Sequence, residues 1–168
     1  RQAQQQIYAK FSSKMLSVCR QYIKDIHHAE DVMITGFMKV FTNLKNFEHK
    51  GSFEGWIRRI MVYECIDFLR VKKNNFSHQD IEDVTISENE SVYEMEDFSV
   101  DDIQNMIDNL PDGYKMVFNL YAIEGYKHQE IAEMLKISEG TSKSQLSHAR
   151  KLLQQQITEL KKKLNGTK

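Results

Sequence analysis

Apolar side chains recur three and four positions apart along most of this 168-residue chain. That interval places them on one face of an α-helix, whereas a half-buried strand would alternate apolar and polar residues. Seven glycines and a single proline supply little material for the turns of an all-β fold. Hydrophobic residues make up 40% of the chain, enough for a packed core. The sequence therefore predicts an all-α protein of one domain or two small ones.

The first part of the chain predicts three amphipathic helices, at residues 4–25, 29–44 and 52–73. Glu30 and Asp31 are expected in the first turn of the second helix, where the helix dipole favours negative charge. Ser52 is expected to cap the third. The side chains expected to face inward are Ile7, Phe11, Leu16, Val18, Cys19, Tyr22, Ile23, Val32, Phe37, Val40, Phe41, Leu44, Trp56, Ile57, Ile60, Met61, Phe68 and Leu69. Three helices with short joints can bury one core, so this part reads as one helical domain.

The formal net charge of −1 conceals a segregation of charge along the chain. Residues 1–75 hold 13 basic and 7 acidic side chains, and residues 111–168 hold 10 basic and 6 acidic ones. Residues 76–110 hold 11 acidic side chains and no Lys or Arg. Two basic blocks favour polyanionic partners, although ordinary solvated helix surfaces would also be charged. Residues 76–98 lack helical periodicity and are predicted to be an acidic linker, either a tether or a segment that folds back on a basic domain.

Residues 99–125 predict two further helices. Ser99 is a plausible N-cap, and two aspartates follow it in the first turn. Pro111 is expected to start the next helix, where its missing N–H group is not needed. Gly125 is expected to end that helix.

Residues 129–151 carry the most specific local pattern. A short helix at 129–135 is followed by a three-residue turn, and Ser138 is placed to cap a longer helix. The small side chain of Ala132 allows the two helices to approach closely, as in a helix-turn-helix whose second helix enters the DNA major groove. The residues of that second helix expected to be exposed and to contact DNA are Thr141, Ser142, Lys143, Ser144, Gln145, Ser147, His148, Arg150 and Lys151. The alternative is a structural helix pair with a solvated basic face.

The order of these motifs resembles the small alternative sigma factors of the extracytoplasmic-function (ECF) type, two-domain members of the sigma-70 family. Residues 29–41 resemble the family's helix that binds the clamp helices of the RNA polymerase β′ subunit. Phe47 and SFEGWIRRI at 52–60 resemble its "F…SFxxWLxRI" promoter-melting motif, and DFLR at 67–70 resembles "DxLR". Residues 110–150 resemble the pattern "LP…EIAxxLgiseGTVKSRLxRAR". The resemblance covers nearly the whole chain in the family's order.

The resemblance implies three functional parts. Residues 1–75 would be the region 2 domain, which binds polymerase and recognises and melts the −10 element. Residues 76–98 would be the flexible linker, and residues 99–168 the region 4 domain, whose helix-turn-helix reads the −35 element. The residues that the resemblance assigns to polymerase binding are Glu30, Asp31, Phe37 and Lys39.

Melted DNA requires a basic track for its backbone and an aromatic face or pocket for an unstacked base. The residues expected to supply these are Asn43, Lys45, Asn46, Phe53, Trp56, Arg58, Arg59, Arg70, Lys72 and Lys73. The loop that contains Asn43 and Lys45 is assigned to base reading by resemblance alone. Ordinary core packing is an equally good account of Phe53 and Trp56.

Three positions depart from the family pattern. Ser142 and Gln145 stand where the pattern has Val and Arg, and Lys127 stands where a capping Ser or Thr is frequent. Loss of that cap predicts a less stable helix start, by about 1 kcal/mol. Gln145 removes one phosphate-binding charge, so affinity is expected to depend on the remaining basic residues.

The partners implied by the resemblance are core RNA polymerase (the β′ clamp helices and the β flap), promoter DNA and an anti-sigma factor. We expect no enzymatic activity, no cofactor and no metal site, since no His, Cys or carboxylate pair has zinc spacing. Cys19 and Cys65 are expected to be buried, reduced small hydrophobes, which favours the cytoplasm. No apolar run approaches the roughly 20 residues of a transmembrane helix, so no membrane insertion is expected.

Two other classes of protein remain open from the sequence. A stand-alone helix-turn-helix regulator with an N-terminal sensing domain would leave the melting-type motif at 52–60 without a role. An enzyme or adaptor on a helical scaffold would need an apolar pocket with convergent polar groups, which the sequence does not display.

Overall fold

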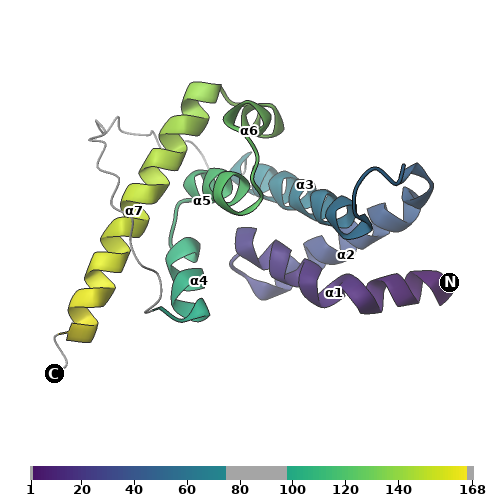
Figure 1. The fold of residues 1–168 in the computed structure, drawn as a ribbon, viewed down its shortest axis with the longest axis horizontal. Coiled ribbons are helices and arrows are strands. Elements are labelled where there is room, and N and C mark those ends of the chain that lie inside the picture. Colours follow the sequence, from purple (N-terminus) through teal and green to yellow (C-terminus); the bar gives the residue numbers. More distant parts are fainter. Residues whose placement is uncertain (1, 75–97, 166–168) are drawn as a thin grey trace. The chain divides into compact units, whose positions relative to one another are not determined.

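The computed structural model describes residues 2–74 and 98–165 (Figure 1). Within those two ranges every regular element is a helix, which confirms the predicted all-α fold. The helices belong to two compact units, Arg1–Phe76 and Ser77–Lys168, and each is described here by itself. The acidic linker predicted at 76–98 lies outside the described residues except for its last residue.

Unit 1 is a bundle of three long helices and a short 3-10 turn: α1 (Gln2–Tyr22), α2 (Ile26–Thr42), η1 (Leu44–Asn46) and α3 (Phe53–Asn74). Each of the three long helices packs against the other two, as the purple-to-teal part of Figure 1 shows. The core side chains are Phe11, Met15, Val18, Cys19, Tyr22, Ile23, Ala29, Val32, Met33, Phe37, Val40, Ile57, Met61, Val62, Cys65, Ile66 and Leu69.

The predicted core of unit 1 is confirmed in its main part and wrong at its margins. Both cysteines are buried and unbridged, as expected. Met15 belongs to the core, although it was not among the predicted residues. Several predicted core residues are partly exposed at the edges of the helix faces: Ile7, Leu16, Phe41, Leu44, Trp56, Ile60 and Phe68.

Helix α2 begins three residues earlier than its apolar pattern predicted. The Asp25 carboxylate accepts a hydrogen bond of 2.9 Å from the backbone N–H of His28 and so caps the helix. That hydrogen bond also lowers the pKa of Asp25. The expectation that Glu30 and Asp31 lie in the first turn is therefore wrong, since Asp25 supplies the negative charge at that end. The predicted cap of α3 is confirmed, because Ser52 Oγ accepts a 3.0 Å hydrogen bond from the backbone N–H of Gly55.

Gly36 marks the close approach of α2 to α3. A Cβ atom at this position would overlap Sδ of Met61, whose side chain is fully buried. We therefore expect Gly36→Ala to lower the free energy of unfolding by about 1–3 kcal/mol, the cost of overpacking a filled core. Denaturant unfolding followed by the fluorescence of Trp56, the chain's single tryptophan, reports this unit directly.

Gly140→Ala is the control for Gly36→Ala. It is also a helical glycine, but its added Cβ would meet nothing closer than 3.8 Å. Because Gly140 lies in unit 2, both variants are also followed by far-UV circular dichroism, which reports the helices of both units. We expect Gly140→Ala to unfold at the wild-type denaturant concentration or slightly above it, since Ala is the better helix former. An unchanged unfolding midpoint for Gly36→Ala would contradict the close approach of the two helices.

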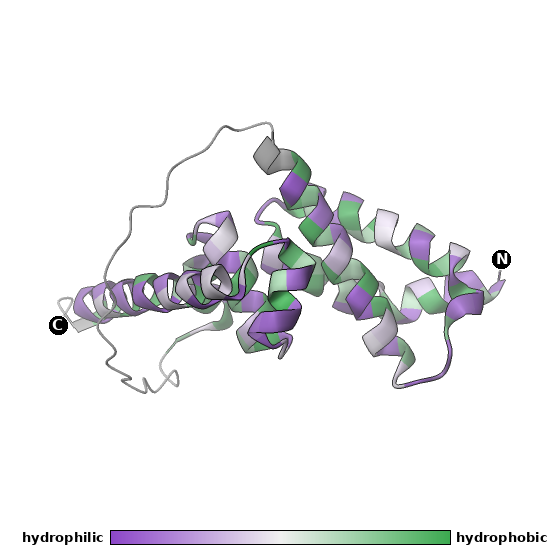
Figure 2. Ribbon diagram, turned by 90° about the horizontal axis from the view of Figure 1, so that it is seen from above, coloured by the Kyte–Doolittle hydropathy of each residue, from purple (hydrophilic) through white to green (hydrophobic). Residues whose placement is uncertain are grey.

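Unit 2 contains α4 (Val100–Asp108), α5 (Asp112–Phe118), the π-helical turn η2 (Asn119–Ile123), α6 (His128–Leu135) and α7 (Glu139–Asn165). Helix α7, yellow in Figure 1, packs against α4, α5 and α6. Colouring by hydropathy shows hydrophilic residues along much of α7 (Figure 2). The core side chains of the unit are Met106, Ile107, Leu110, Val117, Leu120, Ile131, Met134, Leu146, Ala149 and Ile157.

The local signals in unit 2 are confirmed. Ser99 forms a capping box with Asp102, in which each residue's side chain accepts a hydrogen bond of 3.1 Å from the other's backbone N–H. Pro111 immediately precedes α5. Gly125 adopts φ +78°, a left-handed conformation suited to glycine, just after the helical segment ends. The π-helical turn η2 was not predicted, and it is closed by the hydrogen bond from the Glu124 N–H to the Asn119 carbonyl, five residues back.

Candidate nucleic-acid interface

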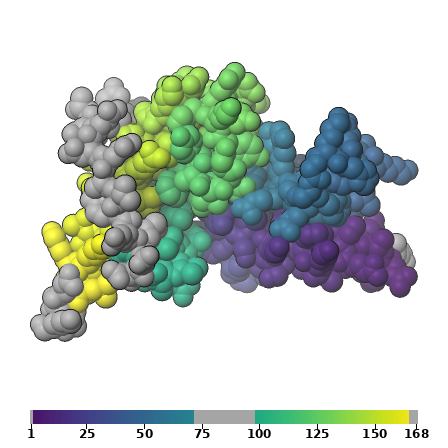
Figure 3. Space-filling view, viewed as in Figure 1, coloured from purple at the N-terminus to yellow at the C-terminus, as the bar shows by residue number. Residues whose placement is uncertain are grey.

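Helices α6 and α7 are joined by a tight turn, as predicted for a helix-turn-helix. Lys136 ends α6 in the left-handed conformation (φ 56°), and its N–H group bonds to the Ala132 carbonyl. Ser138 Oγ accepts a 2.9 Å hydrogen bond from the Thr141 N–H and caps α7. Figure 3 shows α6 and the first turns of α7, both in light green, side by side on one face of the unit.

The start of α6 keeps half of a capping box despite having Lys127 at the cap position. The Lys127 side chain has no acceptor atom and cannot bond to the exposed N–H groups of the first turn. Glu130 nevertheless accepts a 2.7 Å hydrogen bond from the backbone N–H of Lys127. This hydrogen bond partly offsets the loss of stability predicted at the start of α6.

Ser142 is buried, and the expectation that it is exposed toward DNA is wrong. Its exposed fraction is 0%, and it shares the inward stripe of α7 with Leu146 and Ala149 at i+4 and i+7. The Ser142 hydroxyl forms a 2.9 Å hydrogen bond with Nδ1 of His128 on α6. Ser142 thus joins the two helices of the motif and is not available to DNA in this structure.

The exposed face of α7 carries basic and small polar side chains. Lys143, Arg150 and Lys151 are exposed, while Thr141, Ser144, Ser147 and His148 are partly exposed. Because they are four and three residues apart, Lys143, Ser147 and Arg150 lie on one face of the helix. Lys143 also pairs with Glu139, one turn earlier, at 3.1 Å.

Two predicted DNA-facing residues of α7 pack against α5. The Gln145 side-chain carbonyl oxygen is buried without a hydrogen-bond partner and lies against Gly113, whose Cβ position would be 2.9 Å from it. The His148 ring stacks on Tyr114, with 5.4 Å between centroids and 17° between planes. Gln145 therefore fills the α5–α7 contact instead of standing free beside the basic residues.

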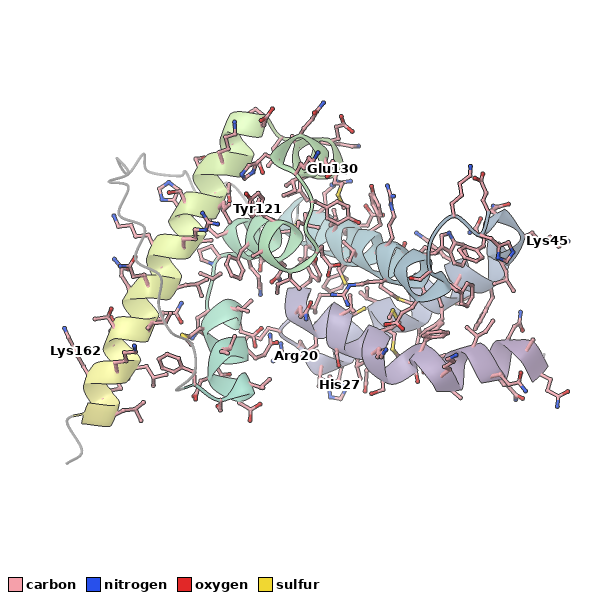
Figure 4. All side chains as sticks on the ribbon, viewed as in Figure 1. Arg20, His27, Lys45, Tyr121, Glu130 and Lys162 are labelled. Atoms are coloured by element: carbon pink, nitrogen blue, oxygen red, sulfur yellow. The ribbon has the colours of Figure 1, made fainter. Side chains whose placement is uncertain are left out.

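An aromatic stack that the sequence did not reveal lies beside the basic face. The ring of Tyr121, an exposed residue of η2, stacks on His128 with 4.6 Å between centroids and 20° between planes. The Arg150 guanidinium lies 5.8 Å from the centroid of the Tyr121 ring. Figure 4 labels Tyr121 beside α7, with Glu130 on α6. His128 thus contacts Ser142 and Tyr121, while Arg150 lies over the Tyr121 ring.

Burial lowers the pKa of His128, as do the nearby charges of Lys143 and Arg150, whereas Glu139 raises it. The unfolded chain therefore binds this proton more readily than the folded one. The corresponding stability is present above the ordinary histidine pKa of about 6.5 and is lost as the pH falls through the lowered value. We expect the thermal unfolding midpoint of the wild type to fall between pH 7.5 and pH 5.5 by more than that of His128→Asn. An identical pH dependence in the two proteins would contradict this assignment.

In unit 1, the connection between α2 and α3 presents polar side chains on an aromatic support. Asn43, Lys45 and Asn46 are exposed, and Asn46 Nδ2 donates a 3.1 Å hydrogen bond to Asn43 Oδ1. Lys45 stands at the end of the unit that this connection forms (Figure 4). The Phe47 ring anchors the connection, since it packs 5.2 Å from Phe53 between ring centroids.

Phe53 and Trp56 belong to that support. Their rings stack at 5.7 Å with 24° between planes, and Trp56 lies 5.4 Å from Phe47. Phe53 also meets Phe11 of α1, 5.9 Å away. All three rings of this aromatic cluster, Phe47, Phe53 and Trp56, are partly exposed. The cluster therefore packs internally, while part of each residue remains exposed to solvent.

The predicted basic track follows α3. Arg59 is exposed and lies 5.9 Å from the Tyr63 ring centroid, while Arg58 and Arg70 are partly exposed. Arg70 pairs with Asp67 at 3.4 Å. Lys72 and Lys73 fall within α3, but their side chains lie outside the described residues.

The predicted polymerase-binding residues divide between core and surface. Phe37 is 2% exposed and packs against Tyr8, 4.9 Å away, so it cannot contact a partner directly in this structure. Lys39 forms an ion pair with Glu64 of α3. Asp31 is exposed and Glu30 partly exposed, so these two carboxylates remain available.

Two large apolar side chains, missed by sequence reasoning, are exposed on the same helix. Ile34 is 48% exposed and Met38 is 65% exposed, one turn apart. With Asp31 they form one face of α2, at i, i+3 and i+7. We call Asp31, Ile34 and Met38 the α2 face. Adjacent exposed apolar residues beside a charge are typical of a protein–protein contact.

Residues 2–74 and 98–165 contain neither a candidate metal cluster nor a candidate membrane span. In these ranges no group of three or more His, Cys, Asp or Glu residues could hold a metal ion. None of the helices described there is long and apolar enough to cross a bilayer.

Comparison with known proteins gives a match on each unit. The family described as "Sigma-70 region 2" matches residues 7–75, and "Sigma-70, region 4" matches residues 100–153. The ECF RNA polymerase sigma factor SigW of Bacillus subtilis is 29% identical over 163 residues, covering 89% of this chain and 86% of the relative. The ECF RNA polymerase sigma-E factor of Haemophilus influenzae is 24% identical over 169 residues, covering 92% of this chain and 87% of the relative.

A solved structure shares the fold. The sigma factor RpoE of Bartonella quintana, crystallised with the anti-sigma factor NepR, superposes with a TM-score of 0.58 at 19% identity. The superposition covers 92% of this chain and 96% of that chain.

Proposed function

We infer the roles of individual surfaces from the premise that this chain belongs to the sigma-70 family, as an ECF-type RNA polymerase sigma factor that directs core polymerase to specific promoters and helps open the DNA. The observation that carries this conclusion is the ordered pair of family matches, region 2 on unit 1 and region 4 on unit 2. The family is regulatory, and we propose that this chain has no catalytic activity of its own and acts in the cytoplasm, where polymerase works.

We propose a division of labour between the parts of the chain. Residues 1–75 bind polymerase and open the −10 element, residues 99–168 read the −35 element, and residues 76–98 join them. The charge distribution supports this division, since the 13 basic residues of the first part and the 10 basic residues after position 110 flank a stretch without Lys or Arg.

The α2 face is the proposed contact with the β′ clamp helices of polymerase. Asp31 supplies a charge, and Ile34 and Met38 supply apolar area that is otherwise left in water. Phe37 is buried against Tyr8 of α1 and is left out of this face. Unit 2 is proposed to contact the β flap, as the family resemblance implies.

The proposed duplex-binding surface is the face of α7 around Lys143, Ser147 and Arg150. Lysine and arginine neutralise phosphates, and Arg can also read guanine in the major groove. The other exposed or partly exposed residues proposed to contact the duplex are Thr141, Ser144, His148 and Lys151. Buried Ser142 and packed Gln145 are left out of this surface.

The connection between α2 and α3 is the proposed site for melted DNA. Its exposed Asn43, Lys45 and Asn46 directly precede Phe47 of the aromatic cluster, whose partly exposed rings are proposed to stack with an unstacked base. The basic side chains of Arg58, Arg59 and Arg70 are proposed to follow the strand's backbone, with Lys72 and Lys73 continuing the track.

The double variant Lys45→Ala/Asn46→Ala tests the melted-DNA site. We expect holoenzyme to form normally but open its promoter about tenfold more slowly, the loss typical of one missing base contact. Reactivity of unpaired thymines toward permanganate measures the opening. Lys24→Ala removes an exposed charge elsewhere in unit 1 and controls for net charge. Equal opening rates for the double variant and this control would contradict the site.

An anti-sigma factor is the proposed regulatory partner. The structural relative RpoE is bound to an anti-sigma factor, and CnrH, with a TM-score of 0.50, is bound to the cytosolic domain of CnrY. We propose that this chain is held inactive by a protein of the same kind.

Association with core polymerase tests the proposed function. Purified chain and core enzyme from the encoding bacterium, mixed and separated by size-exclusion chromatography, are expected to elute together. The proposal is overturned if the chain elutes apart from core enzyme and binds promoter duplex as tightly without core enzyme as with it. A stand-alone DNA-binding regulator behaves in that way.

A further inference from the structure

A buried hydroxyl at the start of the recognition helix needs a partner. Ser142 is fully buried in a stripe that otherwise holds Leu146 and Ala149. A buried hydroxyl without a hydrogen bond is costly, so the site has to supply one. The side-chain partner is Nδ1 of His128, 2.9 Å from the Ser142 oxygen. This polar contact replaces the apolar contact that a Val, usual in the family pattern at this position, would make.

His128 connects three elements of unit 2 through one ring. It is the first residue of α6, its edge bonds to Ser142 of α7, and its face stacks on Tyr121 of η2. The guanidinium of Arg150 lies 5.8 Å from the centroid of the Tyr121 ring. The charged groups that act on His128 are Lys143, Glu139 and Arg150, all from α7.

We propose that His128 is a positioning residue for promoter recognition: its hydrogen bond to Ser142 sets the start of α7 against α6, and its stack on Tyr121 sets the ring over which Arg150 lies. This inference rests on the proposed function of α7 as the duplex-reading helix. Base-edge contacts depend on side chains held within a fraction of an ångström, so a shifted helix loses selectivity while phosphate contacts largely persist. Promoter selectivity therefore depends on a histidine that acts through Ser142 and Tyr121.

Two substitutions of His128 separate its hydrogen bond from its stack. His128→Phe keeps a ring on Tyr121 but leaves the Ser142 hydroxyl without its partner. His128→Asn loses the ring but places an amide at a similar reach to Nδ1. The probes are a duplex that wild-type holoenzyme selects from a random-sequence library and a scrambled duplex of equal composition.

We expect His128→Phe to weaken holoenzyme binding to the selected duplex about tenfold, comparable to a single mismatched base pair, and binding to the scrambled duplex by less than about twofold. His128→Asn keeps the hydrogen bond but loses the stack, so it is expected to lose part of the selectivity, and less of it than His128→Phe. The double variant His128→Phe/Ser142→Val removes both polar partners and is expected to recover most of what His128→Phe loses. A merely structural role would weaken binding to both duplexes alike and would not be rescued in this way.

The outcomes separate this inference from the proposed function. If wild-type holoenzyme prefers no duplex, the proposed function fails. If the wild type is selective and His128→Phe has the same selectivity, or both duplexes weaken equally, the positioning role is overturned. Should His128→Phe fail to fold, Tyr121→Leu tests the same stack at an exposed position, with Tyr121→Phe as the control that keeps the ring. A reduced selectivity in Tyr121→Leu alone supports the role, and equal selectivity in both variants overturns it.

Discussion

Replacing Ile34 and Met38 together by Asp is expected to abolish stable binding to core RNA polymerase. Both side chains are exposed in the free chain, at 48% and 65%, so the fold does not depend on their burial. Charged groups in place of central apolar contacts leave uncompensated charge in an interface. Truncating a single hot-spot residue typically lowers the binding free energy by about 2 kcal/mol or more, which is about 30-fold in affinity. Two such losses predict a reduction of about 100-fold or more.

Fluorescence anisotropy of the labelled chain, titrated with core enzyme, measures this loss. Ile26→Asp and Val71→Asp are the matched controls, because they alter exposed apolar residues of the same unit outside the α2 face. Both controls are expected to bind core enzyme within about twofold of wild type. Equal weakening by the controls and the double variant would show that the α2 face is not the polymerase contact.

The second large effect is expected from Lys143→Ala and Arg150→Ala on the recognition helix. Each removes an exposed cation from the face of α7 proposed to meet the duplex. Each phosphate contact contributes about 0.9 to the slope of log affinity against log salt, so we expect the double variant to lower that slope by nearly 2. At low salt, affinity for the selected duplex should fall further for Arg150→Ala, by about tenfold or more, because Arg150 is also proposed to read a base.

Lys162→Ala is the control for this pair. It removes an exposed lysine from the same helix, near its C-terminal end (Figure 4). We expect its salt slope and affinity to match wild type. If duplex binding by Lys143→Ala/Arg150→Ala is unchanged at both low and moderate salt, the recognition helix has been placed wrongly.

Features encoded by neighbouring residues could be predicted from the sequence. Ser52, Ser99 and Ser138 cap helices as expected, because a cap needs only the N–H groups two or three residues ahead. Gly125 ends a helical segment for a similarly local reason, its left-handed backbone conformation. Asp25 is also a local cap, but the predicted start of α2 at residue 29 placed it outside the helix.

Features decided by packing between helices were predicted less well. Ser142 was expected on the exposed face, because a polar residue beside Lys143 in sequence gives no sign that it pairs with a histidine fourteen residues earlier. Gln145 was wrongly expected to stand free for the same reason. Its side chain lies against Gly113 of α5, in space that a larger residue at position 113 would fill. The π-helical turn that contains Tyr121 has no simple pattern in the sequence.

The α2 face shows why interface residues escape periodicity arguments. Ile and Met are residue types usually found in protein cores, and the helix that carries Ile34 and Met38 also contains the buried Phe37 and Val40. Only the packing of α1 and α3 around α2 determines which apolar residues are covered. Phe37, assigned to polymerase binding by resemblance, lies on the covered side, and its neighbours on the open side take its place in the proposal.

Transcription by reconstituted holoenzyme tests the central claim most directly. Core polymerase from the encoding bacterium, with and without this chain, is supplied with fragmented genomic DNA from that bacterium, and the 5′ ends of the transcripts are sequenced. We predict a small set of start sites that require the chain, share two conserved upstream elements and disappear with the Ile34→Asp/Met38→Asp variant. Start sites that are the same with and without the chain would contradict its role as a sigma factor.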